Sequence, residues 1–181
     1  MYVPRKMFLT KGVGRHKEKL TSLELALRRA GIAPFNLIKV SSIYPPGCKI
    51  VSRAAALKIL KPGQVVHTVM SEICTQEPHR LISTSIGLAI PTDCNQYGYL
   101  SEHHAFGQTD EVAGEYAEDL AASMLATILG VDFDPDLNYD EKKEIWRISG
   151  KIIRTRNVTQ SAIGHEAGLF TTCVAAAVLI P

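Results

Sequence analysis

The segment FNLIKVSSIYPPGCKI, residues 35–50, joins an alternating apolar run to two adjacent serines and then to two adjacent prolines. The alternation predicts a β-strand over residues 35–42, and a residue that precedes proline is restricted to extended conformations. The pair Ser41-Ser42 is therefore expected at the end of a strand, between two stiff stretches of chain. Two interpretations follow. The pair is a polar turn that ends the strand, or the Ser42 hydroxyl is held in place to attack the carbonyl of Ser41.

The composition is that of a soluble globular protein with a single domain, residues 1–181. Hydrophobic residues make up 46% of the 181 residues and charged residues 21%. The formal net charge of +2 gives no electrostatic basis for binding nucleic acid. The N-terminus lacks the apolar stretch of a signal peptide, and the longest apolar run, CVAAAVLI from Cys173, is too short to span a bilayer. We expect a cytoplasmic protein with no nucleic-acid or membrane partner.

The four cysteines indicate neither a metal site nor a disulfide scaffold. They are widely spaced and form no C-x-x-C pair, which argues against a zinc site. Four cysteines in a chain of this length are also too sparse to staple a fold, so a reducing compartment is expected.

The hydrophobic pattern predicts an α/β layered sandwich with elements in the order β-α-β-β-β-β-α-β-β. Strands are expected at residues 2–10, 35–42, 64–76, 80–90, 97–106, 145–160 and 168–180. The strands 64–76 and 80–90 flank the residues Glu-Pro-His, so they are expected to pair as an antiparallel hairpin. The last strand is nearly all apolar, which predicts burial on both faces.

Two helices are expected. The first covers residues 21–31, with Thr21 or Ser22 as its N-cap and Gly31 at its C-terminal end. The second runs from Asp110 to Leu129, and Gly130 ends it. Apolar residues recur at every fourth position of this second helix and are expected to face the core: Val112, Tyr116, Leu120, Met124 and Ile128.

Three stretches together carry a resemblance to a known family. NLIKVSSIYPP at 36–46, GYLSEHHAFGQT at 98–109 and TTCVAAAV at 171–178 resemble the pyruvoyl-dependent arginine decarboxylases. The likeness extends from PRKMFLTKG, which begins at Pro4, to the last strand. The resemblance implies a four-layer αββα sandwich that assembles as a homotrimer, with active sites between neighbouring subunits.

For the serine pair, the resemblance implies self-cleavage. The Ser42 hydroxyl attacks the Ser41 carbonyl, and β-elimination from the resulting ester releases a β-chain of residues 1–41. The α-chain, residues 42–181, then begins with a covalent pyruvoyl group made from Ser42, so no free cofactor is needed. The ketone of this group forms a Schiff base with the amine of L-arginine and accepts electrons as carbon dioxide leaves, giving agmatine, a polyamine precursor.

Two further residues match catalytic positions of the family. Glu102, in GYLSEHH, stands where the family has its proton donor, a role that requires a raised carboxyl pKa. Asn36 matches an active-site asparagine, whose amide would hold the Ser41 carbonyl before cleavage or orient the pyruvoyl group afterwards. From the residues alone, Glu102 also fits a solvent-facing strand glutamate, and Asn36 a polar residue at a strand edge.

The resemblance also indicates residues that bind the substrate. Glu24 lies where the family's first helix carries a carboxylate for the guanidinium group, and some relatives have aspartate there. Phe35 and Ile43 match positions that line the alkyl stem of the substrate. Glu24 is equally compatible with an exposed helix residue.

Other interpretations remain open. Strand alternation places Glu102 and His104 on one face and His103 on the other, and a metal would need His67 or His165 as a third ligand. No spacing supports such a site, so no metal is expected. Two alternatives to the arginine decarboxylase are a pyruvoyl decarboxylase of another amino acid, such as histidine or aspartate, and a non-catalytic trimeric module. A hydrolase with Ser42 as nucleophile is disfavoured because no G-x-S-x-G motif surrounds it.

Overall fold

The computed structural model describes residues 2–131, 141–142, 145 and 150–181 of this α/β protein. The strands are β1 Lys6–His16, β2 Asn36–Lys39, β3 Ile43–Tyr44, β4 Lys49–Ile50, β5 Val65–Thr75, β6 Leu81–Pro91, β7 Gly98–Phe106, β8 Ile152–Ile163 and β9 Phe170–Ile180. The helices with described bounds are α1 Lys19–Ala30, α2 Arg53–Leu57 and α3 Asp110–Leu129. One sheet has the strand order β2-β5-β9-β1-β4, and the other has the order β3-β7-β6-β8.

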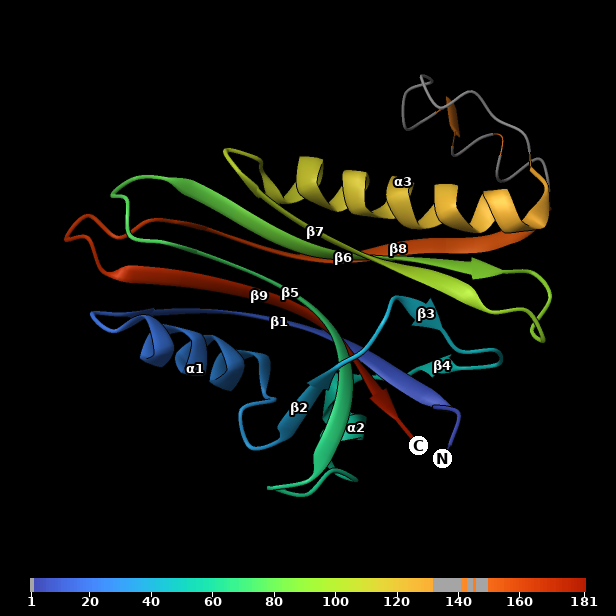
Figure 1. The fold of residues 1–181 in the computed structure, drawn as a ribbon, viewed down its shortest axis with the longest axis horizontal. Helices are drawn as coiled ribbons and strands as arrows, with labels where there is room; N and C mark the ends of the chain where they lie inside the picture. Colours follow the sequence, from blue (N-terminus) through green and yellow to red (C-terminus); the bar gives the residue numbers. More distant parts are fainter. Residues whose placement is uncertain (1, 132–140, 143–144, 146–149) are drawn as a thin grey trace.

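The two sheets pack face to face, with α1 against the outer face of the five-stranded sheet and α3 against that of the four-stranded sheet (Figure 1). Apolar side chains fill the space between the sheets, including Met7, Val69, Ile86, Leu100 and Leu179. A polar contact also joins the sheets, because the hydroxyl of Thr84 on β6 donates to that of Ser71 on β5 at 2.7 Å. The interior between the sheets is therefore continuous and mostly apolar.

Strand β9 is the central strand of the larger sheet. It pairs antiparallel with β1 on one side and with β5 on the other. Every residue from Thr171 to Ile180 is buried. The prediction of a last strand buried on both faces is confirmed.

Glycines let α1 lie close to the sheet. The first strand continues to His16, so the expected end at residue 10 is wrong, and Gly12 and Gly14 lie inside it. A Cβ atom added at Gly12 would overlap the Ala26 carbonyl oxygen of α1, and one at Gly14 would overlap that of Ser22. The G-x-G pair therefore serves close packing of a helix on a strand.

The expected hairpin between residues 64–76 and 80–90 is wrong. Strand β5 pairs with β2 and β9, whereas β6 pairs with β7 and β8 in the other sheet. The connection at residues 76–80 carries the chain from one sheet to the other. Both strands are buried on both faces over most of their length, so alternation gives no signal that assigns them to separate sheets.

The first helix starts earlier than predicted. Its N-cap is Glu18, so the assignment of Thr21 or Ser22 as the cap is wrong. The Ser22 hydroxyl is buried inside the helix, donates to the Lys19 carbonyl at 2.7 Å and contacts the Thr172 hydroxyl at 2.6 Å. Gly31 ends the helix with a left-handed φ of 78°, as predicted.

The bounds predicted for α3 are confirmed, but its buried face is not the predicted one. Val112 and Tyr116 are 50% and 51% exposed, and Leu120 and Ile128 are also exposed. The buried face consists mainly of small residues: Ala113, Gly114, Ala117, Ala121, Ala122, Leu125 and Ala126. The helix lies so close to β6 that a Cβ atom at Gly87 would overlap the Ala117 carbonyl oxygen, and only small side chains fit there.

The strand expected at residues 145–160 begins later. β8 covers Ile152–Ile163, and residues 146–149 of the predicted strand lie outside the described part of the chain. Among the described helices, none combines the length and the apolar character that crossing a membrane requires. All four cysteines are in the described part of the chain and are free thiols.

Candidate active site

The Ser41–Ser42 peptide bond lies where the chain crosses from β2 in one sheet to β3 in the other. On the β2 side, the Val40 N–H donates to the Thr68 carbonyl at 3.0 Å, which extends the pairing with β5. On the β3 side, the Leu100 N–H of β7 donates to the Ser42 carbonyl at 2.8 Å. Val40, just before the serine pair, and Ser42 are thus attached to different sheets.

A second hydrogen bond forms within the junction itself. The Ile43 N–H donates to the Ser41 carbonyl at 3.0 Å, closing a three-residue turn centred on Ser42. Ser41 is exposed and Ser42 is half-buried. The carbonyl groups of Ser41 and Ser42 therefore each accept a hydrogen bond from a backbone N–H.

A cavity of about 520 Å³ opens beside Ser41. Its lining is mainly apolar and includes Val3, Val40, Ile43 and Leu179. Its polar groups include the Tyr2 hydroxyl and the Nδ1 of His67, which lie 3.0 Å apart. Ile43 lines this cavity beside Ser41, and its role in binding the substrate stays a prediction.

Glu102 lies on β7, two residues beyond Leu100 and on the same side of the strand. Partial burial raises the pKa of the Glu102 carboxyl above its usual value, and the positive charges of Lys39 and His104 oppose this shift. The Lys39 ammonium also lies 3.7 Å from a carboxylate oxygen of Glu72. In the single chain Glu102 is exposed and is not among the described residues that line the cavity beside Ser41. It lies two residues along β7 from Leu100, whose N–H donates to the Ser42 carbonyl.

The histidines divide as strand alternation predicts. His104 acts electrostatically on Glu102, whereas His103 faces α3, where its ring centroid lies 4.4 Å from that of Tyr116. The His165 ring accepts a hydrogen bond from the Ala167 N–H at 3.1 Å. Within residues 2–131, 141–142, 145 and 150–181, no three histidine, cysteine or acidic side chains gather in a way that could hold a metal ion.

The other three predicted residues lie away from Ser41. The Asn36 amide donates to the Gly63 carbonyl at 2.7 Å, at the opposite end of β2. Glu24 is on α1 and pairs with Arg28 at 2.5 Å. Phe35 packs in the core between α1 and the sheet. As far as the chain is described, none of the three lines the cavity beside Ser41.

Sequence reasoning missed Lys39 and the backbone donors of Ile43 and Leu100. Lys39 did leave a signal, because it is the one charged residue in the apolar run that leads to the serines. The backbone donors left none, because they depend on the pairing of β3 with β7 and on the turn at Ser42.

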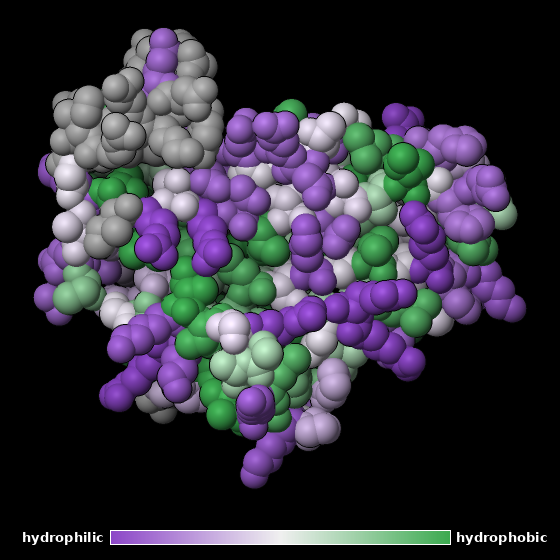
Figure 2. Space-filling model, turned by 180° about the vertical axis from the view of Figure 1, so that it is seen from behind, coloured by the Kyte–Doolittle hydropathy of each residue, from purple (hydrophilic) through white to green (hydrophobic). Residues whose placement is uncertain are grey.

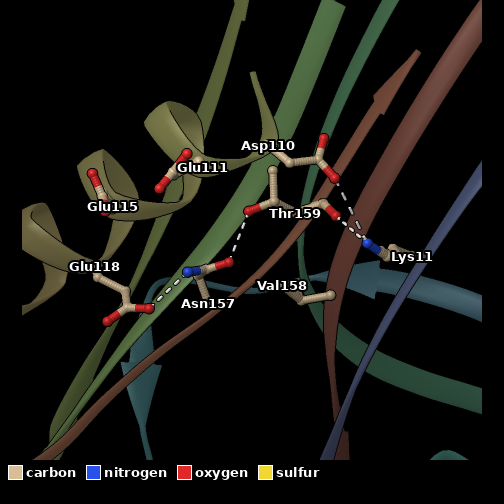
Figure 3. Close-up of a pocket in the computed structure, with 8 residues that line it drawn as sticks. All are labelled: Lys11, Asp110, Glu111, Glu115, Glu118, Asn157, Val158 and Thr159. Atoms are coloured by element: carbon tan, nitrogen blue, oxygen red, sulfur yellow. Dashed lines mark hydrogen bonds and ion pairs between the residues drawn. The ribbon is translucent and has the colours of Figure 1, made fainter. Parts of the chain in front are cut away.

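A second pocket, of about 490 Å³, lies between the first turns of α3 and the strands β1 and β8 (Figure 3). Lys11 donates to the Thr159 carbonyl at 2.6 Å and lies 3.9 Å from the Asp110 carboxylate. Asn157 donates to Glu118 at 2.6 Å and accepts from the Thr159 hydroxyl at 2.9 Å. None of the residues predicted for the active site lines this acidic pocket in the described structure.

Comparison with known proteins gives consistent matches along the whole chain. The family model described as pyruvoyl-dependent arginine decarboxylase matches residues 6–181. The chain is 58% identical over 180 residues to a probable pyruvoyl-dependent arginine decarboxylase of Chloroherpeton thalassium, covering 99% of each chain. It is 54% identical over 178 residues to the pyruvoyl-dependent arginine decarboxylase of Nitrosopumilus maritimus, covering 98% of this chain and 97% of the relative.

Proposed function

The chain belongs to the pyruvoyl-dependent arginine decarboxylase family, and we propose that it decarboxylates L-arginine to agmatine and carbon dioxide. The observation that carries this proposal is the family match over residues 6–181, together with relatives of that name at 58% identity. The enzyme is then a carboxy-lyase with a covalent pyruvoyl group. A cytoplasmic location and a single domain of residues 1–181 remain predictions.

The pyruvoyl group is proposed to arise from Ser42 by self-cleavage. The Ser42 hydroxyl attacks the Ser41 carbonyl, and the amide becomes an ester. Loss of the Cα proton of residue 42 and breakage of its Cβ–O bond release a β-chain, residues 1–41, as a carboxylate. The dehydroalanine left at position 42 tautomerises, and water replaces its nitrogen as ammonia, leaving the pyruvoyl group on residues 42–181.

The surroundings of the junction fit this group. A pyruvoyl group supplies a ketone that condenses with the substrate amine and a conjugated carbonyl that takes up the electrons released with carbon dioxide. The Leu100 N–H holds the Ser42 carbonyl, which would become that conjugated carbonyl. The cavity beside Ser41 would give the substrate access to this point, with Ile43 in its lining.

Glu102 is proposed as the proton donor to the Cα of the product. A donor must be protonated at the working pH, and burial favours the protonated form of this carboxyl. Its position on β7, two residues from Leu100, supports the assignment. Lys39 opposes the shift and so tunes the pH range over which Glu102 holds its proton.

Substrate recognition is proposed to involve two subunits. Glu24 would pair with the guanidinium group, and Asn36 and Phe35 would complete the site, although all three lie away from Ser41 in one chain. A homotrimer with active sites between subunits would reconcile these positions. Exposed apolar side chains support such contacts, among them Tyr2, Val3, Ile38 and Val65. Figure 2 shows hydrophobic surface at its lower left, toward the end of the molecule that carries both termini.

The proposal includes a four-layer αββα sandwich. It is supported by the spatial order of the layers, which is α1, the five-stranded sheet, the four-stranded sheet and α3 (Figure 1). The proposed substrate is L-arginine, and histidine and aspartate are the alternatives.

The test begins with an intact-mass spectrum of the purified protein under denaturing conditions. Two species with a break after Ser41 and a pyruvoyl group at position 42 are expected in place of the single 19.8 kDa chain. Release of labelled carbon dioxide from arginine, histidine and aspartate then identifies the substrate. A chain that stays intact would instead favour the non-catalytic module.

A further inference from the structure

We propose that the backbone N–H of Ile43 is a catalytic hydrogen-bond donor in the self-cleavage of this chain. It would stabilise the negative charge that develops on the Ser41 carbonyl oxygen as the Ser42 hydroxyl attacks. The inference rests on the self-cleavage proposed above, and adds to it the group that acts as the oxyanion donor.

The distance is suitable for this role. The Ile43 nitrogen lies 3.0 Å from the Ser41 carbonyl oxygen before any reaction. Donors that stabilise an oxyanion typically lie about 2.7–3.1 Å from it. The donor is already in place, so little reorganisation is needed when the charge appears.

The register of β3 leaves this N–H available. Ile43 lies opposite Tyr99 on β7, and the Leu100 N–H bonds to the carbonyl of Ser42. In an antiparallel pair, residues bonded to the partner strand alternate with residues that are not. Positions 42 and 44 therefore point their backbone groups toward β7, and the N–H of Ile43 points away from it.

The structure on both sides keeps the turn from relaxing. Val40 is bonded to Thr68 on one side, and the Ser42 carbonyl is bonded to β7 on the other. Beyond β3, Tyr44 is buried and its hydroxyl donates to the Cys48 carbonyl. The N–H of Cys48 in turn donates to the Pro45 carbonyl at 3.1 Å.

Asn36, whose amide was expected to hold the Ser41 carbonyl, makes a different hydrogen bond in the structure. The Asn36 amide donates to the Gly63 carbonyl, at the far end of β2 from Ser41. Within one chain, the Ser41 carbonyl instead accepts from Ile43. The backbone donor takes over one of the two roles considered for Asn36.

The Ile43 N–H acts in the first step of cleavage. A bond forms between the Ser42 Oγ and the Ser41 carbonyl carbon, and the hydroxyl proton passes to solvent. The carbonyl oxygen carries the negative charge in a five-membered ring. The C–N bond then breaks, the carbonyl re-forms as an ester, and the Ser42 nitrogen takes up a proton. In this first step the negative charge is on the Ser41 oxygen while the ring exists, and that is where the donor would act.

The test measures the rate of cleavage and does not depend on decarboxylase activity. The chain is made by cell-free translation with a pulse of label, and conversion to two fragments is followed by gel electrophoresis and mass spectrometry. In one variant, suppression of a stop codon replaces Ile43 with its α-hydroxy analogue, which exchanges the N–H for oxygen and keeps the side chain. Cleavage is expected to slow by about 100- to 1,000-fold, the usual effect of losing one oxyanion donor.

A control variant separates chemistry from structure. The α-hydroxy analogue of Tyr44 removes an N–H directed toward β7, and is expected to slow cleavage far less than the analogue at Ile43. Equal slowing at the two positions, or a wild-type rate for the Ile43 analogue, would overturn the inference. Failure of the wild-type chain to cleave would instead overturn the proposed function.

Discussion

The chain passes between the two sheets at several points, and two of these crossings, at residues 40–42 and at residues 76–80, are built differently. At the first, Ser42 is bonded to β7 and Val40 to β5, so the crossing is tied to both sheets. At the second, one contact lies within the crossing itself, because the Arg80 guanidinium pairs with the Glu77 carboxylate at 2.7 Å.

The second crossing is closed by backbone bonds to a neighbouring loop. The His79 N–H donates to the Gly164 carbonyl at 3.0 Å, and the Gly164 N–H donates to the Arg80 carbonyl at 2.8 Å. His79 adopts a left-handed φ of 61°, a conformation that L-residues other than glycine seldom adopt. The crossing at residues 76–80 is long enough to fold as a loop. The shorter crossing at residues 40–42 holds the Ser41–Ser42 peptide bond between the two sheets. The proposed self-cleavage takes place in the short crossing.

Replacing Ser42 with alanine should have the largest effect on the first crossing. Ser42→Ala removes the attacking hydroxyl, so the chain should fold and remain a single species near the 19.8 kDa mass of the intact protein. Intact-mass spectrometry measures this directly. Ser41→Ala keeps the carbonyl and is the matched control, which should still be cleaved. Efficient cleavage of the Ser42 variant would remove the proposed source of the pyruvoyl group.

Glu102→Gln should separate turnover from maturation. The variant should be cleaved normally, because its carboxyl is assigned to proton return and not to the serine attack. Its kcat should fall by about 100- to 10,000-fold, the usual contribution of a positioned acid. Glu72→Gln, which changes the other carboxylate near Lys39, is the matched control and should retain far more activity. Near-normal kcat in Glu102→Gln would mean that another group supplies the proton.

Gly164→Ala should weaken the second crossing and leave the first unchanged. A Cβ atom at this position would overlap the Glu77 carbonyl oxygen, so the loop must shift. Overpacking of this kind costs about 1–3 kcal/mol, which urea unfolding of the Ser42→Ala background would measure without interference from cleavage. In the otherwise wild-type chain, the extent of cleavage should be unchanged. A loss of cleavage would show that the two crossings are coupled.

Lys39→Met should have the smallest effect, a shift in pH dependence. A proton donor loses activity as pH rises through its pKa, and the Lys39 charge lowers the pKa of Glu102. Removing that charge should raise this pKa, so the fall in kcat should move to higher pH. Lys39→Arg keeps the charge and should keep the wild-type profile. A shift to lower pH would contradict the assignment of Glu102 as the donor.

The sequence predicted the elements that local signals define. Asp110 and Gly130 marked the ends of α3, and alternation located most of the strands. The buried face of α3 was missed because it depends on contact with Gly87, a residue of another element. The assignment of β5 and β6 to one hairpin failed for a similar reason, since strand partners are set by the packing of the whole molecule.

The candidate site divides in the same way. Resemblance pointed to Ser41, Ser42 and Glu102, and β7 carries both Leu100, which bonds to Ser42, and Glu102, two residues further along. The hydrogen bonds to the two carbonyl groups could not be read from residue types, because any residue supplies a backbone N–H. The roles proposed for Glu24 and Asn36 rest on the proposed arrangement of subunits, which sequence periodicity does not encode.

The pairing of β1 with β9 gains a different meaning once the proposed cleavage occurs. Strand β1 would belong to the β-chain and β9 to the α-chain, joined by a continuous register from Lys6–Ile180 to His16–Phe170. The two products would then be interleaved partners without a covalent link, and unfolding would become dissociation. The stability of the mature enzyme would therefore depend on its concentration, whereas that of the precursor as a single chain would not. The precursor would refold as one chain, whereas the cleaved enzyme would have to refold and reassociate from two separate chains.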